Sequence, residues 1–362
     1  MNTLCMESGF VSLNKQGEDL CGDFFTTVSD DDATTFVLSD GMGSGVKANI
    51  LATLTAKILA TMTANHLSIR DSVTTLAQTL PVCSVRKLAY STFTLMQVLP
   101  DWQVYLAQFD NPQAILLRDG KSVEYPTQEL MVGDKRILES RLTLQSGDVF
   151  LLMTDGVTHA GLGNLIPDGW QREGVLQYVE EIYTPELSAK NLAARVADAC
   201  RDLYLERIDD DVTVAVFKMR TRQAVNLLVG PPRQHEDDEA FMHRFFASEG
   251  THIVCGGSTA QMVSRYLGRQ LIISEDYVDP DIPPVAKIRG IDLVTEGIVT
   301  LSRVLEMAGR YASSQSIPSH WDTRSDAATQ IARVLLEDAT DIHFFVGRAV
   351  NPSHQSPSRH IY

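Results

Sequence analysis

Two apolar segments of this chain each end in an aspartate that is followed by glycine. The β-rich run Thr34–Ser39 leads into Asp40, and the run Gly147–Thr154 leads into Asp155. Apolar, β-branched and aromatic side chains favour strands, and an Asp-Gly pair is a turn signal that ends them. The sequence therefore predicts two buried strands with an acid at the end of each.

A third acid, Asp210, comes just before the strand-like run Val212–Phe217. A strand that begins next to its acid is expected to run antiparallel to strands that end at theirs. We therefore expect Asp40, Asp155 and Asp210 to meet at one edge of a sheet.

A fourth acid is connected to this group by a predicted hairpin. The runs Phe24–Val28 and Thr34–Ser39 flank the polar segment Ser29–Ala33, which is typical of a hairpin connection. Residues at equal distances from the turn of an antiparallel hairpin face each other. Asp23 is therefore expected to lie close to Asp40.

The segments around these acids show both helical and strand-like patterns. A glycine-rich turn follows Asp40, and the apolar spacing beyond it predicts helices and then further strands. The expected helices are Ala48–Met62, Ser68–Thr79, Gly174–Ile182 and Ala189–Tyr204, and the other expected strands are Tyr90–Val98, Val104–Phe109 and Ala114–Leu117.

Two domains are expected, because 362 residues exceed the size of a typical single domain. A polar boundary near Arg220–Arg222 divides residues 1–220 from residues 221–362. In the second part, strands expected at 224–229, 252–255, 291–294 and 341–346 alternate with helices expected at 236–246, 258–267, 297–308 and 327–336. This alternation predicts a smaller α/β domain with a partly parallel sheet.

Charge and cysteine content exclude several classes of protein. The formal net charge of −15 argues against nucleic acid as a partner and against adsorption to anionic membranes. Five widely spaced cysteines without a Cys-x-x-Cys pair indicate neither a disulfide framework nor a zinc site. Neither a secretory leader nor an apolar run of about 18 residues, the length of a membrane span, is present. We expect a cytoplasmic protein.

The clustered acids predict a metal centre. Carboxylates held close together raise one another's pKa or repel, and divalent cations relieve this conflict. Oxygen ligands without neighbouring His or Cys favour Mg²⁺ or Mn²⁺ over zinc. Two such ions about 3.5–4 Å apart acidify a water and hold a phosphate, so hydrolysis of a phosphoester is the predicted reaction. Gly41 has no side chain, which lets its carbonyl approach an ion as a ligand.

Each motif has a plainer interpretation when it stands alone. An isolated Asp-Gly pair is more often an exposed turn than part of an active site, and the acidic run Asp209–Asp211 is more often solvated. The order of the motifs and their positions next to strands favour catalysis instead.

Taken together, the motifs resemble those of the metal-dependent protein phosphatase (PPM) family, in its SpoIIE-like bacterial branch. The stretch Leu38–Gly45, with its Asp-Gly-Met-Gly-x-Gly pattern, is highly specific. The matching stretches, in family order, are Gly22-Asp23, Leu38–Gly45, Ser91-Thr92-Phe93, Gly147-Asp148 with Leu152–Val157, and Asp210–Thr213.

This resemblance implies a fold and a set of roles. Residues 1–220 would form an α+β domain, a four-layer α-β-β-α sandwich with a centre of two Mn²⁺ or Mg²⁺ ions at one end. Asp40 would bridge both ions, and Asp155 and Asp210 would hold the first. The carbonyl of Gly41 would hold the second ion, on which Asp23 would act directly or through water.

The resemblance also implies a reaction and a partner. The protein would be a serine/threonine phosphatase that dephosphorylates small anti-sigma-factor-antagonist (STAS-type) domains. Residues 47–62 and 68–79 correspond to the region that controls assembly of the metal site in this branch, although plain core packing is an alternative. Two other functions stay open, namely a catalytically silent scaffold that binds phosphoproteins and a phosphatase of small phosphoesters.

Three further residues are candidates near the site. Asp211 would support the metal ligands by hydrogen bonding, with a plain acid at the start of a strand as the alternative. His159 could assist protonation of the leaving group, although a polar surface histidine is the plainer interpretation. Ser44 could contact phosphate or cap the helix that follows it.

The second domain contains one candidate anion-binding loop, Gly256, Gly257, Ser258 and Thr259, between an expected strand and helix. Backbone N–H groups and the helix dipole favour an anion at such a junction. The loop lacks both the Lys of a P-loop and a Gly-x-Gly-x-x-Gly pattern, so a close-packed turn is an equal alternative. A second junction, Asp292–Gly297, could share the same edge of a parallel sheet.

Overall fold

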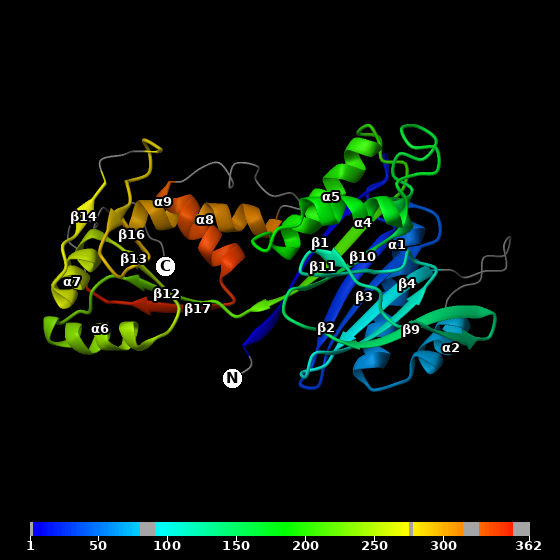
Figure 1. Ribbon diagram of the computed structural model, residues 1–362, viewed down its shortest axis with the longest axis horizontal. Helices are drawn as coiled ribbons and strands as arrows, with labels where there is room; N and C mark the ends of the chain where they lie inside the picture. Colours follow the sequence, from blue (N-terminus) through cyan, green and yellow to red (C-terminus); the bar gives the residue numbers. More distant parts are fainter. Residues whose placement is uncertain (1–2, 80–90, 275–277, 314–325, 350–362) are drawn as a thin grey trace. The chain divides into compact units, whose positions relative to one another are not determined.

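A computed structural model of the chain describes residues 3–79, 91–274, 278–313 and 326–349 (Figure 1). The chain divides into two compact units, Met1–Thr221 and Arg222–Tyr362. Cys83 and Tyr90, the latter the expected start of a strand, lie outside the described residues. Within the described ranges no two cysteines form a disulfide.

The first unit contains two antiparallel sheets, with the strand orders β1-β11-β10-β6-β7 and β2-β3-β4-β5-β9-β8. The strands are β1 (Leu4–Leu13), β2 (Asp23–Ser29), β3 (Thr34–Gly41), β4 (Ser91–Val98), β5 (Gln103–Phe109), β6 (Ile115–Arg118), β7 (Lys121–Ser122), β8 (Gln128–Val132), β9 (Lys135–Thr143), β10 (Asp148–Met153) and β11 (Val212–Thr221). The helices are α1 (Gly45–Ala64), α2 (Ile69–Thr79), α3 (Asp155–Thr158), α4 (Gln171–Ile182) and α5 (Ala189–Leu203).

The two sheets share one apolar core. Phe36 and Leu38 of β3 belong to the same buried cluster as Phe150 of β10 and Phe217 of β11. The ring centroids of Phe36 and Phe217 are 4.5 Å apart, a distance typical of favourable aromatic pairs. This shared core fixes β3 of one sheet against β10 and β11 of the other.

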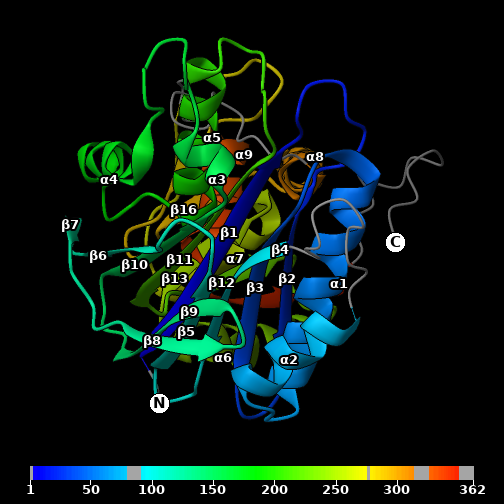
Figure 2. The same cartoon turned by 90° about the vertical axis from the view of Figure 1, so that its right-hand side faces the viewer.

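Helices cover the outer faces of both sheets. Ala56 and Leu59 of α1 and Val73 of α2 pack with Leu95 of β4, so α1 and α2 lie on the outer face of the second sheet (Figure 2). On the first sheet, α5 packs against β1 and β11 and buries Val196. The expected mixed fold of helices and several sheets is confirmed.

In the first unit, β1, β7, β8 and β9 have no counterpart in the sequence-based prediction. β1 contains Gly9, whose added Cβ would lie 2.4 Å from the backbone of Lys190 in α5, so the glycine is needed for close helix packing. β8 and β9 carry exposed charged side chains such as Glu129 and Arg136, which interrupt the apolar pattern that marks a strand.

The predicted hairpin is confirmed. Oδ1 of Asp30 accepts hydrogen bonds from the backbone N–H groups of Asp32 and Ala33, both at 2.8 Å, which stabilises the turn. β2 and β3 are antiparallel, and their register places Asp23 directly opposite Asp40.

The glycine after each strand-end acid allows close packing. A Cβ on Gly41 would lie 1.9 Å from the carbonyl oxygen of Ala48 in α1, and one on Gly156 would lie 2.0 Å from the carbonyl oxygen of Asp211. No side chain fits at either distance. The two Asp-Gly pairs therefore join elements that lie in contact, besides ending their strands.

The second unit is built on a six-stranded sheet with the order β14-β15-β16-β13-β12-β17. Its strands are β12 (Ala224–Val229), β13 (Thr251–Cys255), β14 (Ile272–Ile273), β15 (Ala286–Lys287), β16 (Leu293–Thr295) and β17 (Asp341–Val346). Its helices are η1 (His235–Asp237), α6 (Asp238–Ala247), α7 (Gly257–Leu267), α8 (Ile298–Ser313), α9 (Ala327–Arg333) and the π-helical turn η2 (Val334–Asp338).

The long strands of this sheet are parallel, as predicted. β13 pairs with β12 and β16, and β17 pairs with β12. Met242 of α6 and Val263 of α7 share a buried cluster on one face, whereas Met307 of α8 and Ile331 of α9 belong to a different cluster. The unit therefore has the doubly covered parallel sheet of an α/β domain.

Replacing Gly41 with alanine is expected to destabilise the first unit by about 3 kcal/mol, because Cβ would overlap the carbonyl of Ala48. Gly133→Ala is the matched control. Gly133 has a φ of +62° but nothing within 4 Å of an added Cβ, so its variant should lose only about 1–2 kcal/mol. Urea unfolding followed by the fluorescence of Trp102 and Trp170 measures both, and equal losses would contradict the packing argument.

Candidate functional site

Asp40, Asp155 and Asp210 line one pocket at an end of the first unit. The lining residues, which we call the acid pocket, are Asp40, Gly41, Met42, Gly43, Thr92, Asp155 and Asp210. The sequence-based expectation that the three acids share one sheet edge was wrong. Asp40 belongs to β3, whereas the other two acids border β10 and β11 of the facing sheet. Sequence patterns indicate where strands end but not which sheet each strand joins.

Asp155 and Asp210 are neighbours because β10 and β11 are antiparallel. Met153 pairs with Val214, so the end of β10 lies beside the start of β11. Asp155 is the first residue of the short helix α3, and its side chain is 42% exposed. Burial and the nearby carboxylate of Asp155 raise the pKa of Asp210.

Asp40 lies close to three other carboxylates, whose negative charges disfavour its ionised form. Burial, followed by the carboxylates of Asp23, Asp155 and Asp210, raises the pKa of Asp40 to about 9. A bound cation would therefore favour the ionised form of Asp40.

Asp23 lies behind the pocket and joins the two sheets. It is 4% exposed, and its Oδ2 accepts a 2.8 Å hydrogen bond from Oγ1 of Thr154 at the end of β10. Thr154 Oγ1 in turn accepts a hydrogen bond from the backbone N–H of Thr213. Burial raises the pKa of Asp23 to about 7, and Asp23 Oδ1 has no hydrogen-bond partner within the part of the chain that the structure describes. A buried carboxylate oxygen with no partner is suited to bind a cation.

Asp211 supports the start of β11 and does not line the pocket. Its buried side chain accepts a 3.0 Å hydrogen bond at Oδ1 from the backbone N–H of Lys15. The carbonyl of Asp211 is the group that approaches Gly156. The residue thus fixes the segment that carries Asp210, and the predicted hydrogen bonding to the metal ligands stays a prediction.

Ser44 and Thr92 depart from the sequence-based expectations. Ser44 holds the N-cap position of α1 but makes no capping hydrogen bond, and its hydroxyl donates to Glu18 at 2.9 Å. Thr92 lies opposite Asp40 in the pairing of β3 with β4 and lines the pocket. Thr92 reaches the pocket through the pairing of β4 with β3, two strands that lie far apart along the chain.

The donors of the acid pocket fit hard divalent cations. The pocket gathers carboxylate oxygens and the backbone of Gly41, and such oxygen ligands suit Mg²⁺ and Mn²⁺. Ligand atoms of Asp155, His159 and Asp210 also lie within 4.8 Å of one another. The first unit therefore contains an acidic cluster that can hold a metal ion.

The sequence model of one protein family, stage II sporulation protein E (SpoIIE), matches residues 30–220. The match spans more than half of the chain and includes the three acids of the pocket. The chain belongs to the SpoIIE family. The second unit of this SpoIIE-family protein lies outside the matched residues.

Solved structures share the fold of the first unit. The PP2C phosphatase domain of SpoIIE from Bacillus subtilis, with a fragment of its regulatory domain, aligns at 19% identity and a TM-score of 0.52. The alignment covers 61% of this chain and only 64% of that one. The first unit of this SpoIIE-family protein thus has the PP2C phosphatase fold.

Two further structures align less closely. The RsbU and RsbW domains of Rv1364c from Mycobacterium tuberculosis align at 15% identity and a TM-score of 0.47, covering 67% of this chain and 68% of that one. The PP2C domain of SiaA from Pseudomonas aeruginosa aligns at 19% identity and a TM-score of 0.45, and the alignment covers 58% of this chain and 85% of that one. A search of curated proteins found no match.

Among the described helices of this SpoIIE-family protein, none is long and apolar enough to cross a membrane.

In the second unit, the loop Gly256–Thr259 joins β13 to α7. Gly256 has a φ of +111° and starts α7 without a capping side chain. Thr259 is buried, and its hydroxyl accepts a 3.0 Å hydrogen bond from the backbone N–H of Gly230. An added Cβ on Gly297 would lie 3.3 Å from Cα of Gly256, so the two strand-to-helix junctions share an edge. Phosphate binding by this loop stays a prediction.

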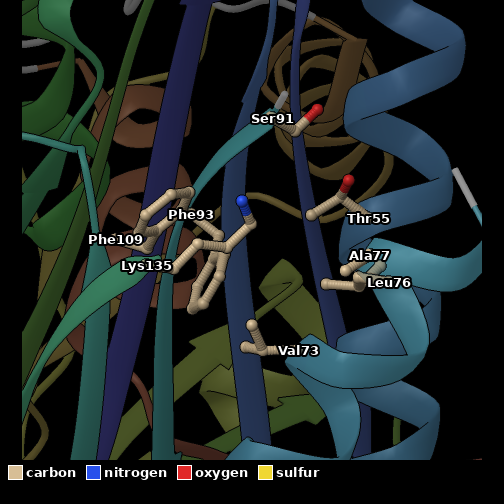
Figure 3. Close-up of a pocket in the computed structure, with 8 residues that line it drawn as sticks. All are labelled: Thr55, Val73, Leu76, Ala77, Ser91, Phe93, Phe109 and Lys135. Carbon is tan, nitrogen blue, oxygen red and sulfur yellow. The ribbon is translucent and has the colours of Figure 1, made fainter. Parts of the chain in front are cut away.

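A small cavity lies on the helix-covered face of the second sheet, close to the acid pocket. Its lining residues are Thr55, Val73, Leu76, Ala77, Ser91, Phe93, Phe109 and Lys135 (Figure 3). The hydroxyls of Thr55 and Ser91 are buried and have no hydrogen-bond partner among the described residues. Ser91 pairs with Gly41 across β3 and β4, so the cavity borders the strand that carries Asp40.

Metal-free protein is expected to lose stability as pH rises from 6 to 8. The pKa values of Asp23 and Asp40 in the folded state, about 7 and about 9, exceed the value of about 3.9 for an exposed aspartate. The folded state therefore holds protons that the unfolded state has released, and each costs about 1.4 kcal/mol per pH unit. Thermal unfolding in EDTA, followed by tryptophan fluorescence, should show a midpoint temperature that falls as the pH rises.

Asp40→Asn is the matched variant for this experiment, because it cannot ionise at that position. Its unfolding midpoint should depend less on pH between 6 and 8, and Mn²⁺ should raise the wild-type midpoint most at pH 8. A wild-type midpoint that rises over this range in EDTA would contradict the assigned direction of the pKa shifts.

Thr55→Val is expected to stabilise the first unit by about 1 kcal/mol, because it replaces an unpaired buried hydroxyl with a methyl group of similar size. Thr94→Val on β4 is the control. The hydroxyl of Thr94 accepts a 3.1 Å hydrogen bond from Asn111, so its loss should destabilise. Shifts of opposite sign in the unfolding midpoint are expected. Destabilisation by both variants would contradict the interpretation that the hydroxyl of Thr55 is buried at a cost.

Proposed function

We propose that the first unit is a metal-dependent protein phosphatase that hydrolyses phosphoserine and phosphothreonine in bacterial signalling. One observation carries the proposal, namely that Asp40, Asp155 and Asp210 come from two facing sheets into one pocket. Membership in the SpoIIE family and the PP2C phosphatase fold support it.

Each acid has a distinct proposed role, which the SpoIIE-like motifs imply and the pocket is able to accommodate. Asp40, whose neighbours are the other carboxylates, would bind both cations. Asp155 and Asp210, adjacent at the ends of β10 and β11, would hold the first cation. The carbonyl of Gly41 and the buried carboxylate of Asp23 would serve the second. When bound, Mn²⁺ or Mg²⁺ ions supply an acidified water and neutralise phosphate charge.

The protein groups position the cations and the substrate. The carboxylates would orient the cations, and Asp211 and Thr154 hold two of the acid-bearing segments through hydrogen bonds. Thr92 and the glycine-rich turn at 41–43 form the rim on which a phosphorylated side chain would rest. No nucleophilic side chain is required for the proposed reaction.

The proposed substrate is a phosphoprotein, and an anti-sigma-factor-antagonist domain of the STAS type is the leading example. The proposal for this partner rests on the SpoIIE-like motifs of the sequence. A cytoplasmic location fits such a substrate.

The test is phosphate release from a phosphoserine peptide, with Mn²⁺, with Mg²⁺ and in EDTA. Turnover is expected only with metal. Asp40→Asn should lower it by more than about a hundredfold, because losing even an outer-shell partner of a metal ligand costs 10–100-fold. Asp32→Asn is the control, since Asp32 is on the same hairpin with a side chain that is 73% exposed. It should leave turnover unchanged.

Two results would contradict the proposal. Turnover in EDTA equal to that with metal would exclude the metal centre, and full activity of a folded Asp40→Asn variant would exclude the assigned ligand. A parallel assay with p-nitrophenyl phosphate separates the substrate classes, because a small-phosphoester phosphatase would turn over this compound but not the peptide.

A further inference from the structure

His159 lies beside two of the pocket acids. It follows α3 directly, and its backbone N–H donates a 2.8 Å hydrogen bond to the carbonyl of Asp155. This single turn brings the side chains of Asp155 and His159 onto the same side. Nδ1 of His159 is 3.9 Å from Oδ2 of Asp155, and one ligand atom each of Asp155, His159 and Asp210 lies within 4.8 Å of the others.

The distance of 3.9 Å between Nδ1 of His159 and Oδ2 of Asp155 suits ligands of one ion better than a hydrogen-bonded pair. A distance of 3.9 Å is too long for a hydrogen bond. Atoms bound to one cation at about 2.1 Å lie about 3 Å apart when adjacent and about 4 Å apart when opposite. The imidazole is 44% exposed, so the ring can turn towards an ion that arrives from solvent.

We propose that His159 is a nitrogen ligand of the cation held by Asp155 and Asp210, and that it makes this site prefer Mn²⁺ to Mg²⁺. The inference rests on the metal centre of the proposed function. Mg²⁺ is bound almost entirely by oxygen, whereas imidazole suits transition metals. The proposal adds a nitrogen ligand, four positions from Asp155, to the all-oxygen set expected from the sequence.

The decisive experiment is pulsed electron paramagnetic resonance of the full chain with one equivalent of Mn²⁺. A directly bound imidazole gives a ¹⁴N modulation of the Mn²⁺ spin echo, and ¹⁵N-histidine labelling changes its pattern. His159→Asp should bind Mn²⁺ but lose the modulation. His66→Asn is the control, because His66 is an exposed histidine of the same unit.

Competition titrations give a second readout. The ratio of the Mg²⁺ to the Mn²⁺ dissociation constant should fall about tenfold or more in His159→Asp, and it should not change in His66→Asn. Bound Mn²⁺ without nitrogen modulation in the wild type, or an unchanged ratio, would overturn the role of His159 alone. Failure of the wild type to bind Mn²⁺ at all would overturn the proposed metal centre as well.

Discussion

Repulsion between the carboxylates of Asp23, Asp40, Asp155 and Asp210 is the interaction on which the design of the first unit depends. These groups are held together by two sheets whose shared core leaves them little freedom to separate. Without a cation, burial and then the neighbouring carboxylates favour the protonated forms of Asp23 and Asp40, which raises the pKa of both groups. The fold thus stores an electrostatic cost that a divalent cation removes.

Close backbone packing surrounds the acids. Gly41 touches α1 through the carbonyl of Ala48, and Gly156 touches the carbonyl of Asp211. A shift of α1 would therefore move the backbone of Gly41, which is a proposed ligand. The small cavity lined by Thr55 and Ser91, whose hydroxyls have no partner in the described ranges, lies where α1 and α2 meet the sheet that contains β3 and β4, so packing there is looser than in the shared core.

The second unit is organised around a largely parallel sheet, unlike the antiparallel sheets of the first. Its parallel strands are covered by helices on both faces, and its strand-to-helix junctions at Gly256 and Gly297 meet at the carboxyl edge of the sheet. In such sheets ligands bind outside this edge. The hydroxyl of Thr259 is already bonded to the backbone of Gly230, so the exposed part of the loop is what could face an anion.

The sequence by itself determined the local features of this protein. The alternation of apolar and turn residues located most strands and helices, and the symmetry of a hairpin was sufficient to place Asp23 opposite Asp40. Only the tertiary structure decided that Asp40 approaches Asp155 and Asp210 from a facing sheet, because strand patterns carry no information about sheet membership. It also decided the positions of Thr92 and His159, whose neighbours depend on how distant strands pair and how one turn of α3 is oriented. Contacts across the chain, unlike turns and periodicities, arise from packing that no single segment encodes.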